Sequence, residues 1–193
     1  MRVVTGLIVG ALVLAGCGVP TQSKPVTLEP GVVPSQLQRT DRTPATTPSA
    51  TAGRPTVEVE FVQHDKLVSR HRVAPTAAPD DVLETVVQAL MSGPSKAEQA
   101  NGLTTALPPG LTLTVSEVRG KRVVLELSGE TEGRSATENV LAVGQIVLSM
   151  TALPSIDEVT LSRGGVPVEA LLADGALTTD PLTAADYASL RPS

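Results

Sequence analysis

The chain has 193 residues, a formal net charge of −5, one cysteine, and Phe61 and Tyr187 as its only aromatic residues. A chain of this length has room for one folded domain once a leader and a linker are set aside. Its acidic balance shows no basic patch, and two aromatic residues are too few to stack successive bases. We therefore expect no nucleic-acid partner.

The first sixteen residues have the features of a secretory signal peptide. Arg2 is the only charge before an apolar run from Val3 to Leu14, and small residues lead to Cys17. This run is shorter than the roughly 20 apolar residues that a membrane-spanning helix needs. The sequence Leu-Ala-Gly-Cys at 14–17 resembles the lipobox of bacterial lipoproteins. The resemblance implies cleavage before Cys17, a diacylglyceryl group on its sulfur and an acyl chain such as palmitate on its new amino group.

Residues 17–55 then change composition. Thr, Pro, Ser and Ala dominate the segment TDRTPATTPSATAGRP, and apolar residues show no periodicity in it. Such a segment cannot bury enough apolar surface to offset the entropy lost on ordering. We expect a disordered tether that carries the lipidated Cys17 and holds the domain at the extracytoplasmic face of the cell membrane. The alternative is that Cys17 is a chance cysteine in an ordinary leader.

Order is predicted to begin with a β-hairpin. Alternation places three apolar side chains on one face of the first strand, namely Val57, Val59 and Phe61. A second strand starts at Leu67, after a turn at 64–66. A three-residue loop would place Glu60 opposite Arg70 and Glu58 opposite Arg72, and such cross-strand pairs stabilise a hairpin by roughly 0.2–1 kcal/mol each.

Two longer helices are predicted. The first lies in APDDVLETVVQALMSGP, where Pro79 suits the first turn, an apolar stripe follows, and Gly93 ends the helix. Residues 95–103 add a short helical turn. Ser135 and Glu138 form a capping-box pattern that opens the second helix, which runs to about Ala152 and is apolar nearly all round.

Three further strands are predicted at 111–118, 122–128 and 156–162, and Gly164-Gly165 forms a turn after the last of them. The order of elements predicts an α+β fold. It is a split β-α-β-β-α-β unit with a mostly antiparallel sheet, an extra N-terminal hairpin, and two helices on one face. The other face should be polar and open to solvent. It would carry Glu58, Glu60, Thr112, Thr114, Ser116, Glu126, Glu158, Thr160 and Ser162.

The sequence shows no recognisable catalytic or cofactor site. His64 and His71 are its only histidines, which is too few ligands for a typical metal site. Glu130 and Glu132 could be imagined as an acid and base for glycan cleavage, but a solvated loop explains them better. Tyr187 is expected to pack the C-terminal tail. We therefore expect no enzyme activity, no metal and no cofactor.

Three segments together resemble the GerMN domain of sporulation and germination proteins. They are ALMSGPSKAEQANGLTTALPPG, TLTVSEVRGKRVVLELSGE and IVLSMTALPSIDEVTLSRGGVPVE, within residues 56–169. The domain also occurs in actinobacterial lipoproteins, including one class that works with a membrane sensor kinase. The resemblance implies an α+β domain similar to the ring-building motifs of secretion and sporulation channels, and it supplies no catalytic residues. Residues 170–193 would form a C-terminal tail, with one helix candidate in TAADYASL.

These observations favour a membrane-anchored lipoprotein whose domain is a non-catalytic interaction or assembly module. Its partners would be membrane lipid through Cys17, an envelope or membrane protein, and a second copy of the chain in the case of self-assembly. A free strand edge could also accept a partner strand. The alternatives are a cell-wall glycan binder or peptidoglycan-processing protein, which would need a pocket with converging polar groups, and a solute-binding lipoprotein.

Overall fold

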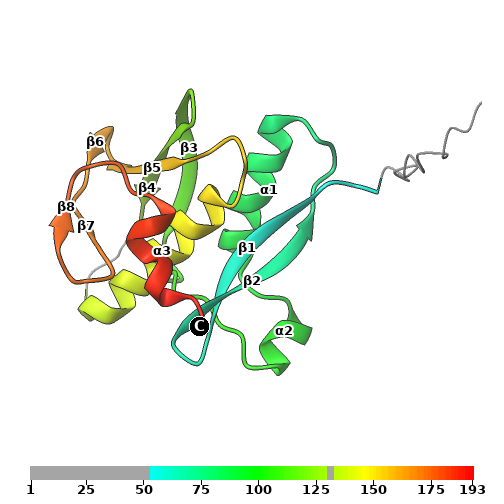
Figure 1. Cartoon of the computed structure of the whole chain (residues 1–193), viewed down its shortest axis with the longest axis horizontal. Coiled ribbons are helices and arrows are strands. Elements are labelled where there is room, and N and C mark those ends of the chain that lie inside the picture. The colour runs from blue at the N-terminus through cyan, green and yellow to red at the C-terminus, as the bar shows by residue number, and fades with distance from the viewer. Residues whose placement is uncertain (1–52, 130–132) are drawn as a thin grey trace, which may run out of the picture. The chain divides into compact units, whose positions relative to one another are not determined.

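The computed structural model describes residues 53–129 and 133–193. The predicted leader, Cys17 and nearly all of the predicted tether lie outside these residues, as do Glu130 and Glu132. The main elements follow one another in the predicted order (Figure 1). Their bounds are β1 Thr56–Gln63, β2 Lys66–Val73, α1 Pro79–Ser92, α2 Lys96–Ala100, β3 Thr112–Arg119, β4 Arg122–Ser128, α3 Ala136–Thr151, β5 Glu158–Arg163, β6 Val166–Pro167, β7 Ala170–Leu171, β8 Leu177–Thr178 and the 3₁₀ helix η1 Ala184–Leu190.

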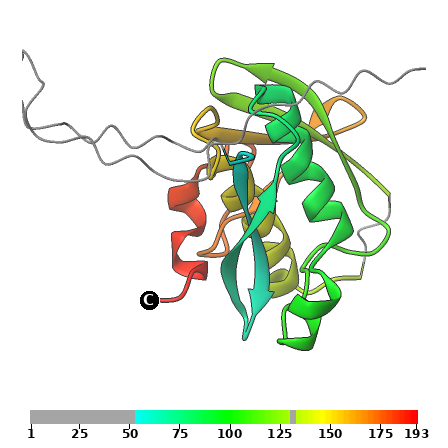
Figure 2. The ribbon, with the colours of Figure 1, turned by 90° about the vertical axis from the view of Figure 1, so that its right-hand side faces the viewer.

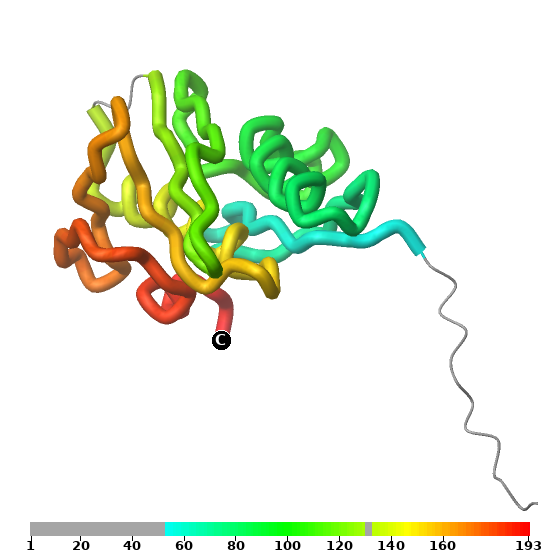
Figure 3. Tube along the Cα trace, turned by 90° about the horizontal axis from the view of Figure 1, so that it is seen from above, coloured from blue at the N-terminus to red at the C-terminus, as the bar shows by residue number. Residues whose placement is uncertain are grey.

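The strands form three sheets. The largest has the order β3-β4-β5-β6, in which β3–β4 and β5–β6 are antiparallel and β4–β5 are parallel. The parallel pair follows from the crossover through α3, and Figure 3 shows β3, β4 and β5 side by side. The hairpin β1–β2 and the short pair β7–β8 are separate two-stranded sheets. The predicted α+β fold with mostly antiparallel strands is confirmed, although the hairpin does not join the main sheet.

The helices begin and end where local chemistry places them. Pro79 lies in the first turn of α1, and the N–H of Gly93, at φ 70°, closes its last turn on Ala89. Capping boxes open α2 at Ser95 and α3 at Ser135, each with a glutamate three residues later. The predicted apolar stripe of α1 is buried, and it contains Leu83, Val86, Val87 and Leu90.

Helix α3 is buried on several sides, as its apolar composition predicts. It contacts β1, β5, β7 and η1, so the polar side chains on it need partners. Ser149 Oγ donates to the carbonyl of Gln145 at 2.7 Å and accepts the N–H of Glu60 at 2.9 Å. Gln145 Oε1 accepts the N–H of Ala106 at 2.8 Å. These bonds fix α3 to the hairpin and to the segment that precedes β3.

The predicted charge pairing in the hairpin is wrong. The turn has two residues, His64 and Asp65, both at positive φ, so Glu60 lies opposite Ser69 and Glu58 opposite His71. The new register changes the cross-strand partners of Glu58 and Glu60 but leaves Val57, Val59 and Phe61 on the buried face.

Glu60 lies on the other face of β1, which is covered as well. Its carboxylate accepts Ser69 Oγ at 2.9 Å and Arg191 Nη2 at 2.8 Å, so its side chain is 1% exposed and is not on an open face.

The C-terminal tail completes the core. Ala170, Leu182 and Tyr187 are buried, and the Tyr187 hydroxyl donates to the carbonyl of Leu171 at 2.9 Å. The backbone of Leu182 pairs with Val159 on the edge of β5. The helix candidate in TAADYASL is the 3₁₀ helix η1, whereas β7 and β8 were not predicted. Figure 2 shows the hairpin between η1 on one side and α1 on the other.

Candidate interaction surfaces

The face of the four-stranded sheet that points away from α1 and α3 is polar, as predicted. Thr112, Thr114 and Ser116 on β3 are exposed, while Glu126, Glu158 and Thr160 are half-buried beside neighbouring strands. The prediction fails for Glu58 and Glu60, which belong to the separate hairpin, and for Ser162, which is buried against β4. The open face is therefore narrower than expected. It carries short hydroxyl side chains on β3, together with Glu117 and Val124, which lie opposite each other beyond a β-bulge.

Glu126 has a structural partner set. Its carboxylate accepts the hydroxyl of Ser162 at 2.7 Å, the N–H of Gly165 at 3.3 Å, and the N–H of Gly164. The bond from Ser162, followed by those from the two glycines, holds the pKa of Glu126 below its usual range. Glu126 thus fastens the predicted Gly164-Gly165 turn between β5 and β6, and it is not free to meet a partner.

A cluster of charges lies at one end of the same sheet. Lys121 Nζ is 3.1 Å from Asp157, and Arg122 Nη2 is 2.7 Å from Glu158. The side chains of Lys121 and Asp157 are largely exposed and those of Arg122 and Glu158 are partly exposed, and such surface pairs contribute about 0–1 kcal/mol each. The pairs balance one another, so this end of the sheet presents no net charge from them.

A hollow of about 250 Å³ lies between α3 and the other end of the sheet. Its walls are mostly apolar, with Val143, Ile146 and Leu161 among them. Two guanidinium groups stand at its rim, and both bind backbone. Arg134 Nη2 donates to the carbonyl of Ala106 at 2.6 Å, and Arg163 Nη1 donates to the carbonyl of Gly129 at 2.8 Å.

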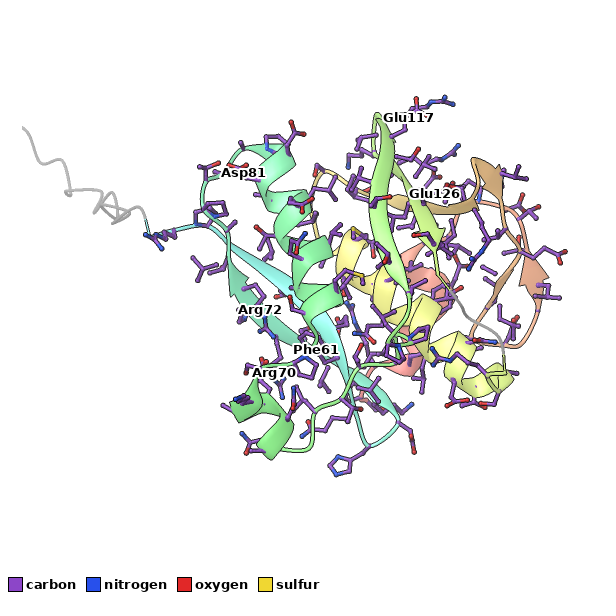
Figure 4. All side chains as sticks on the ribbon, turned by 180° about the vertical axis from the view of Figure 1, so that it is seen from behind. Phe61, Arg70, Arg72, Asp81, Glu117 and Glu126 are labelled. Atoms are coloured by element: carbon purple, nitrogen blue, oxygen red, sulfur yellow. The ribbon has the colours of Figure 1, made fainter. Side chains whose placement is uncertain are left out.

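A second hollow, of about 390 Å³, separates β2 from α1. At its edge Arg72 makes a bidentate pair with Glu98 of α2, at 2.7 and 2.9 Å, and its guanidinium lies 5.0 Å from the centre of the Phe61 ring. Figure 4 shows Arg72 near Phe61, with Asp81 at the start of α1. The hydrogen bonds from Arg72, ahead of those from Ser95, lower the pKa of Glu98 to about 2.

The histidines do not form a site. His64 lies in the hairpin turn and His71 is exposed on β2. Within residues 53–129 and 133–193, no three His, Cys, Asp or Glu side chains gather closely enough to hold a metal ion. No helix in this part of the chain is both long and apolar enough to span a bilayer. Tyr187 packs the tail against α3, as predicted.

The domain thus contains a separate N-terminal hairpin and a four-stranded sheet. Helices cover one face of that sheet, and its other face is polar and open. The family model described as Germane, sporulation and spore germination, matches residues 47–169, which is more than half of the chain. The chain belongs to this family, and its domain is a sporulation- and germination-related GerMN domain. The tail from Ala170 onward lies beyond the match.

Three solved structures are similar to this chain, and the first of them shares its fold. The tandem GerMN domains of GerM from Bacillus subtilis superpose with a TM-score of 0.52 and 19% identity, over 67% of this chain and 46% of that one. This chain thus spans about half the length of the tandem-domain protein. The first GerMN domain of the same protein gives 0.49 and 21% identity, over 66% and 97% of the two chains. A predicted lipoprotein from Clostridium perfringens gives 0.48 and 18%, over 74% and 95%. No curated protein matched.

Proposed function

We propose that this protein is a lipoprotein, anchored through Cys17 at the extracytoplasmic face of the cell membrane, whose GerMN domain binds other envelope proteins without catalysis. The lipobox at 14–17 supports the anchor. The family supports a role related to sporulation or germination for the domain. One anchored domain would then hold its partner within reach of the membrane.

The observation that carries the interaction role is the open face of the four-stranded sheet. Its exposed hydroxyls on Thr112, Thr114 and Ser116 can hydrogen-bond to a partner, and their short side chains lose little rotamer entropy on burial. An open hydroxyl-bearing sheet face suits a protein surface better than a small substrate, which a concave pocket binds.

The carboxylates with lowered pKa support a non-catalytic domain. Glu98 is held by Arg72, Glu126 fastens a turn, and Glu138 caps α3 through the N–H and hydroxyl of Ser135. Each has an ionised carboxylate whose hydrogen bonds stabilise the fold. A catalytic acid would instead need a raised pKa near the working pH.

The experiment is chemical crosslinking in intact cells, followed by affinity capture, with wild type compared with Cys17→Ala. We expect a defined membrane or envelope protein that is captured with wild type and lost with Cys17→Ala. Capture of glycan alone, or turnover of muropeptides by the purified protein, would contradict the proposal.

A surface variant tests the sheet face separately. Thr114→Lys places a long charge on the open face, and we expect it to reduce crosslinking without changing the melting temperature. Thr137→Lys, on the exposed first turn of α3, is the matched control and should behave as wild type. Glu126→Lys is unsuitable because it would release the β5–β6 turn. Equal crosslinking by both lysine variants would mean that the partner binds elsewhere.

A further inference from the structure

The outer edge of β2 is open to a further strand. Glu60 donates its N–H to Ser149, away from β2, so Glu60 and Ser69 form a pair without mutual hydrogen bonds. In an antiparallel ladder such pairs alternate with bonded ones. The backbone groups of Ser69, His71 and Val73 must therefore point away from β1. The bond from the N–H of Ala74 to Pro55 agrees with this alternation.

Part of this edge is already occupied. The carbonyl of Ser69 accepts Arg70 Nη1 at 2.7 Å, and the carbonyl of His71 accepts Arg72 Nη1 at 3.0 Å. The N–H groups of Ser69, His71 and Val73, and the carbonyl of Val73, make no hydrogen bond to any residue in the described part of the chain. The edge thus retains three donors and one acceptor in a row of alternate residues.

The hollow of about 390 Å³ lies at the Val73 end of this edge. Arg72, Val73 and Pro75 form its strand side, and α1 forms the other side with Asp81, Glu84 and Gln88 among its residues. Val73 is 57% exposed and adds an apolar contact surface to the groove. A strand edge that faces a helix across a groove can bind an extended peptide by main-chain hydrogen bonds, with side-chain contacts to the helix.

The charge of this groove is negative. Asp81 accepts a hydrogen bond from Thr76, and Glu84 accepts one from Gln88, but neither takes part in an ion pair within the described residues. The positive charge of Arg72 is paired with Glu98. The negative charge of Asp81 is stabilised in part by the positive end of the α1 dipole, because Asp81 lies in the first turn of the helix. Glu84 lies beyond that turn, where the dipole no longer stabilises a negative charge.

We infer that the groove between β2 and α1 binds an extended segment of a partner protein that carries Lys or Arg side chains. The segment adds a strand to β2 through the N–H groups of His71 and Val73, and its cations face Asp81 and Glu84. This inference rests on the proposed function in that the domain binds proteins, but it concerns a surface distinct from the open sheet face.

The test measures peptide binding by fluorescence anisotropy, with the full chain purified in mild detergent. The probe is a fluorescein-labelled octapeptide of alternating lysine and threonine, and the control probe is the matching glutamate–threonine peptide. We expect the lysine peptide alone to bind. Glu84→Lys should weaken that binding about fivefold, as expected for the loss of an exposed ion pair. Asp180→Lys, the same charge change in the tail, should leave it unchanged.

A backbone variant tests strand addition. His71→Pro removes an outward N–H that the β1–β2 ladder does not use, and proline is tolerated at such edge positions. We expect it to abolish binding, whereas His71→Ala, which keeps the N–H, should bind as wild type. Melting curves show whether each variant is folded. If His71→Pro is unfolded, the Glu84→Lys measurement still tests the inference. Binding of both peptides alike, of neither, or with equal affinity in Glu84→Lys would overturn the inference. In-cell crosslinking that persists after such a result would leave the proposed function standing.

Discussion

The hairpin β1–β2 and the four-stranded sheet contain strands of similar length and similar alternation, yet they are held in place differently. The sheet has several strands in one ladder and covers one face with helices, so it leaves the other face open. A two-stranded hairpin is only marginally stable by itself. Here it is fixed by Ser149 of α3, by Thr104, which pairs with Val62 on the outer edge of β1, and by Arg191 of the tail.

Strands with the same alternating pattern are thus stabilised in two different ways. In the sheet, the backbone N–H and C=O groups of neighbouring strands form hydrogen bonds with one another. In the hairpin, buried polar groups rely on residues far away in the chain, and Glu60 Oε1 accepts Arg191 Nη2 at 2.8 Å across 131 positions. Variants that remove the distant partners should therefore loosen the hairpin before the sheet. Hydrogen exchange of backbone amides can measure the two regions separately.

The largest effect is expected from Tyr187→Ala. The side chain is fully buried against α3, and replacing a buried aromatic residue with alanine costs about 3–5 kcal/mol of unfolding free energy. Denaturant unfolding measures this loss, and the amides of β1 and β2 should exchange faster than those of β3 and β4. Tyr187→Phe, which removes only the bond to Leu171, should cost about 1 kcal/mol. Equal loss of protection in both sheets would contradict the comparison.

The second largest effect is expected from Ser149→Ala. It leaves the buried N–H of Glu60 without its acceptor, and an unsatisfied buried group costs about 1–3 kcal/mol. The expected result is a lower free energy of unfolding, together with faster exchange of the Glu60 amide. Thr114→Val, which also removes a hydroxyl but from the exposed sheet face and keeps a β-branched side chain, is the control and should be nearly neutral. A neutral Ser149→Ala would show that water replaces the hydroxyl.

Gly144→Ala probes the contact between α3 and the tail. A Cβ at this position would lie 2.5 Å from Leu190 Cδ1 and 3.1 Å from Tyr187 Cδ1. Overpacking costs typically about 1–3 kcal/mol, and the better helix propensity of alanine offsets about 1 kcal/mol of it. We expect a net loss near 1 kcal/mol by thermal unfolding. The double variant with Leu190→Ala should recover part of that loss, because the crowded methyl is removed.

The smallest effect is a pH dependence from Glu98. Its pKa is lowered from 4.5 to about 2 in the folded state, chiefly by the hydrogen bond from Arg72. The stabilisation is present above the unfolded pKa and is lost as pH falls from about 4.5 toward 2. Unfolding free energy measured across this range should fall less steeply in Glu98→Gln than in wild type. Parallel curves would mean that the Arg72–Glu98 pair adds nothing to stability.

The elements that depend on local chemistry could be predicted from the sequence. Pro79 and Gly93 bracket α1, the Ser135–Glu138 capping box opens α3, and alternation marks the strands of both sheets. The hairpin register could not be predicted, because His64 and Asp65 both adopt positive φ. Turns of that kind usually contain Gly or Asn-Gly. The residues at 64–66 therefore did not distinguish a two-residue loop from a three-residue loop.

The candidate surfaces were predicted only in part. The hydroxyls of β3 follow from alternation, but the burial of Glu60 depends on the cover that Arg191 gives to its face of β1, and no local pattern links the two residues. The groove brings together β2 and α1, which no local sequence pattern links. Its free N–H groups could be identified only from the structure, because the bond from Glu60 to Ser149 of α3 shows which residues of β2 point away from β1. Strands β7 and β8, of two residues each, are too short to carry a periodic signal.

The burial of Tyr187 has a spectroscopic consequence. The chain contains one tyrosine and no tryptophan, so its tyrosine emission comes from a single position in η1. Burial, with a smaller contribution from Asp186, raises the pKa of its phenol, so alkaline titration followed at the phenolate absorbance should stay silent until the tail leaves the core. The molecule therefore carries its own optical reporter of C-terminal docking, and the event can be timed without attaching a dye.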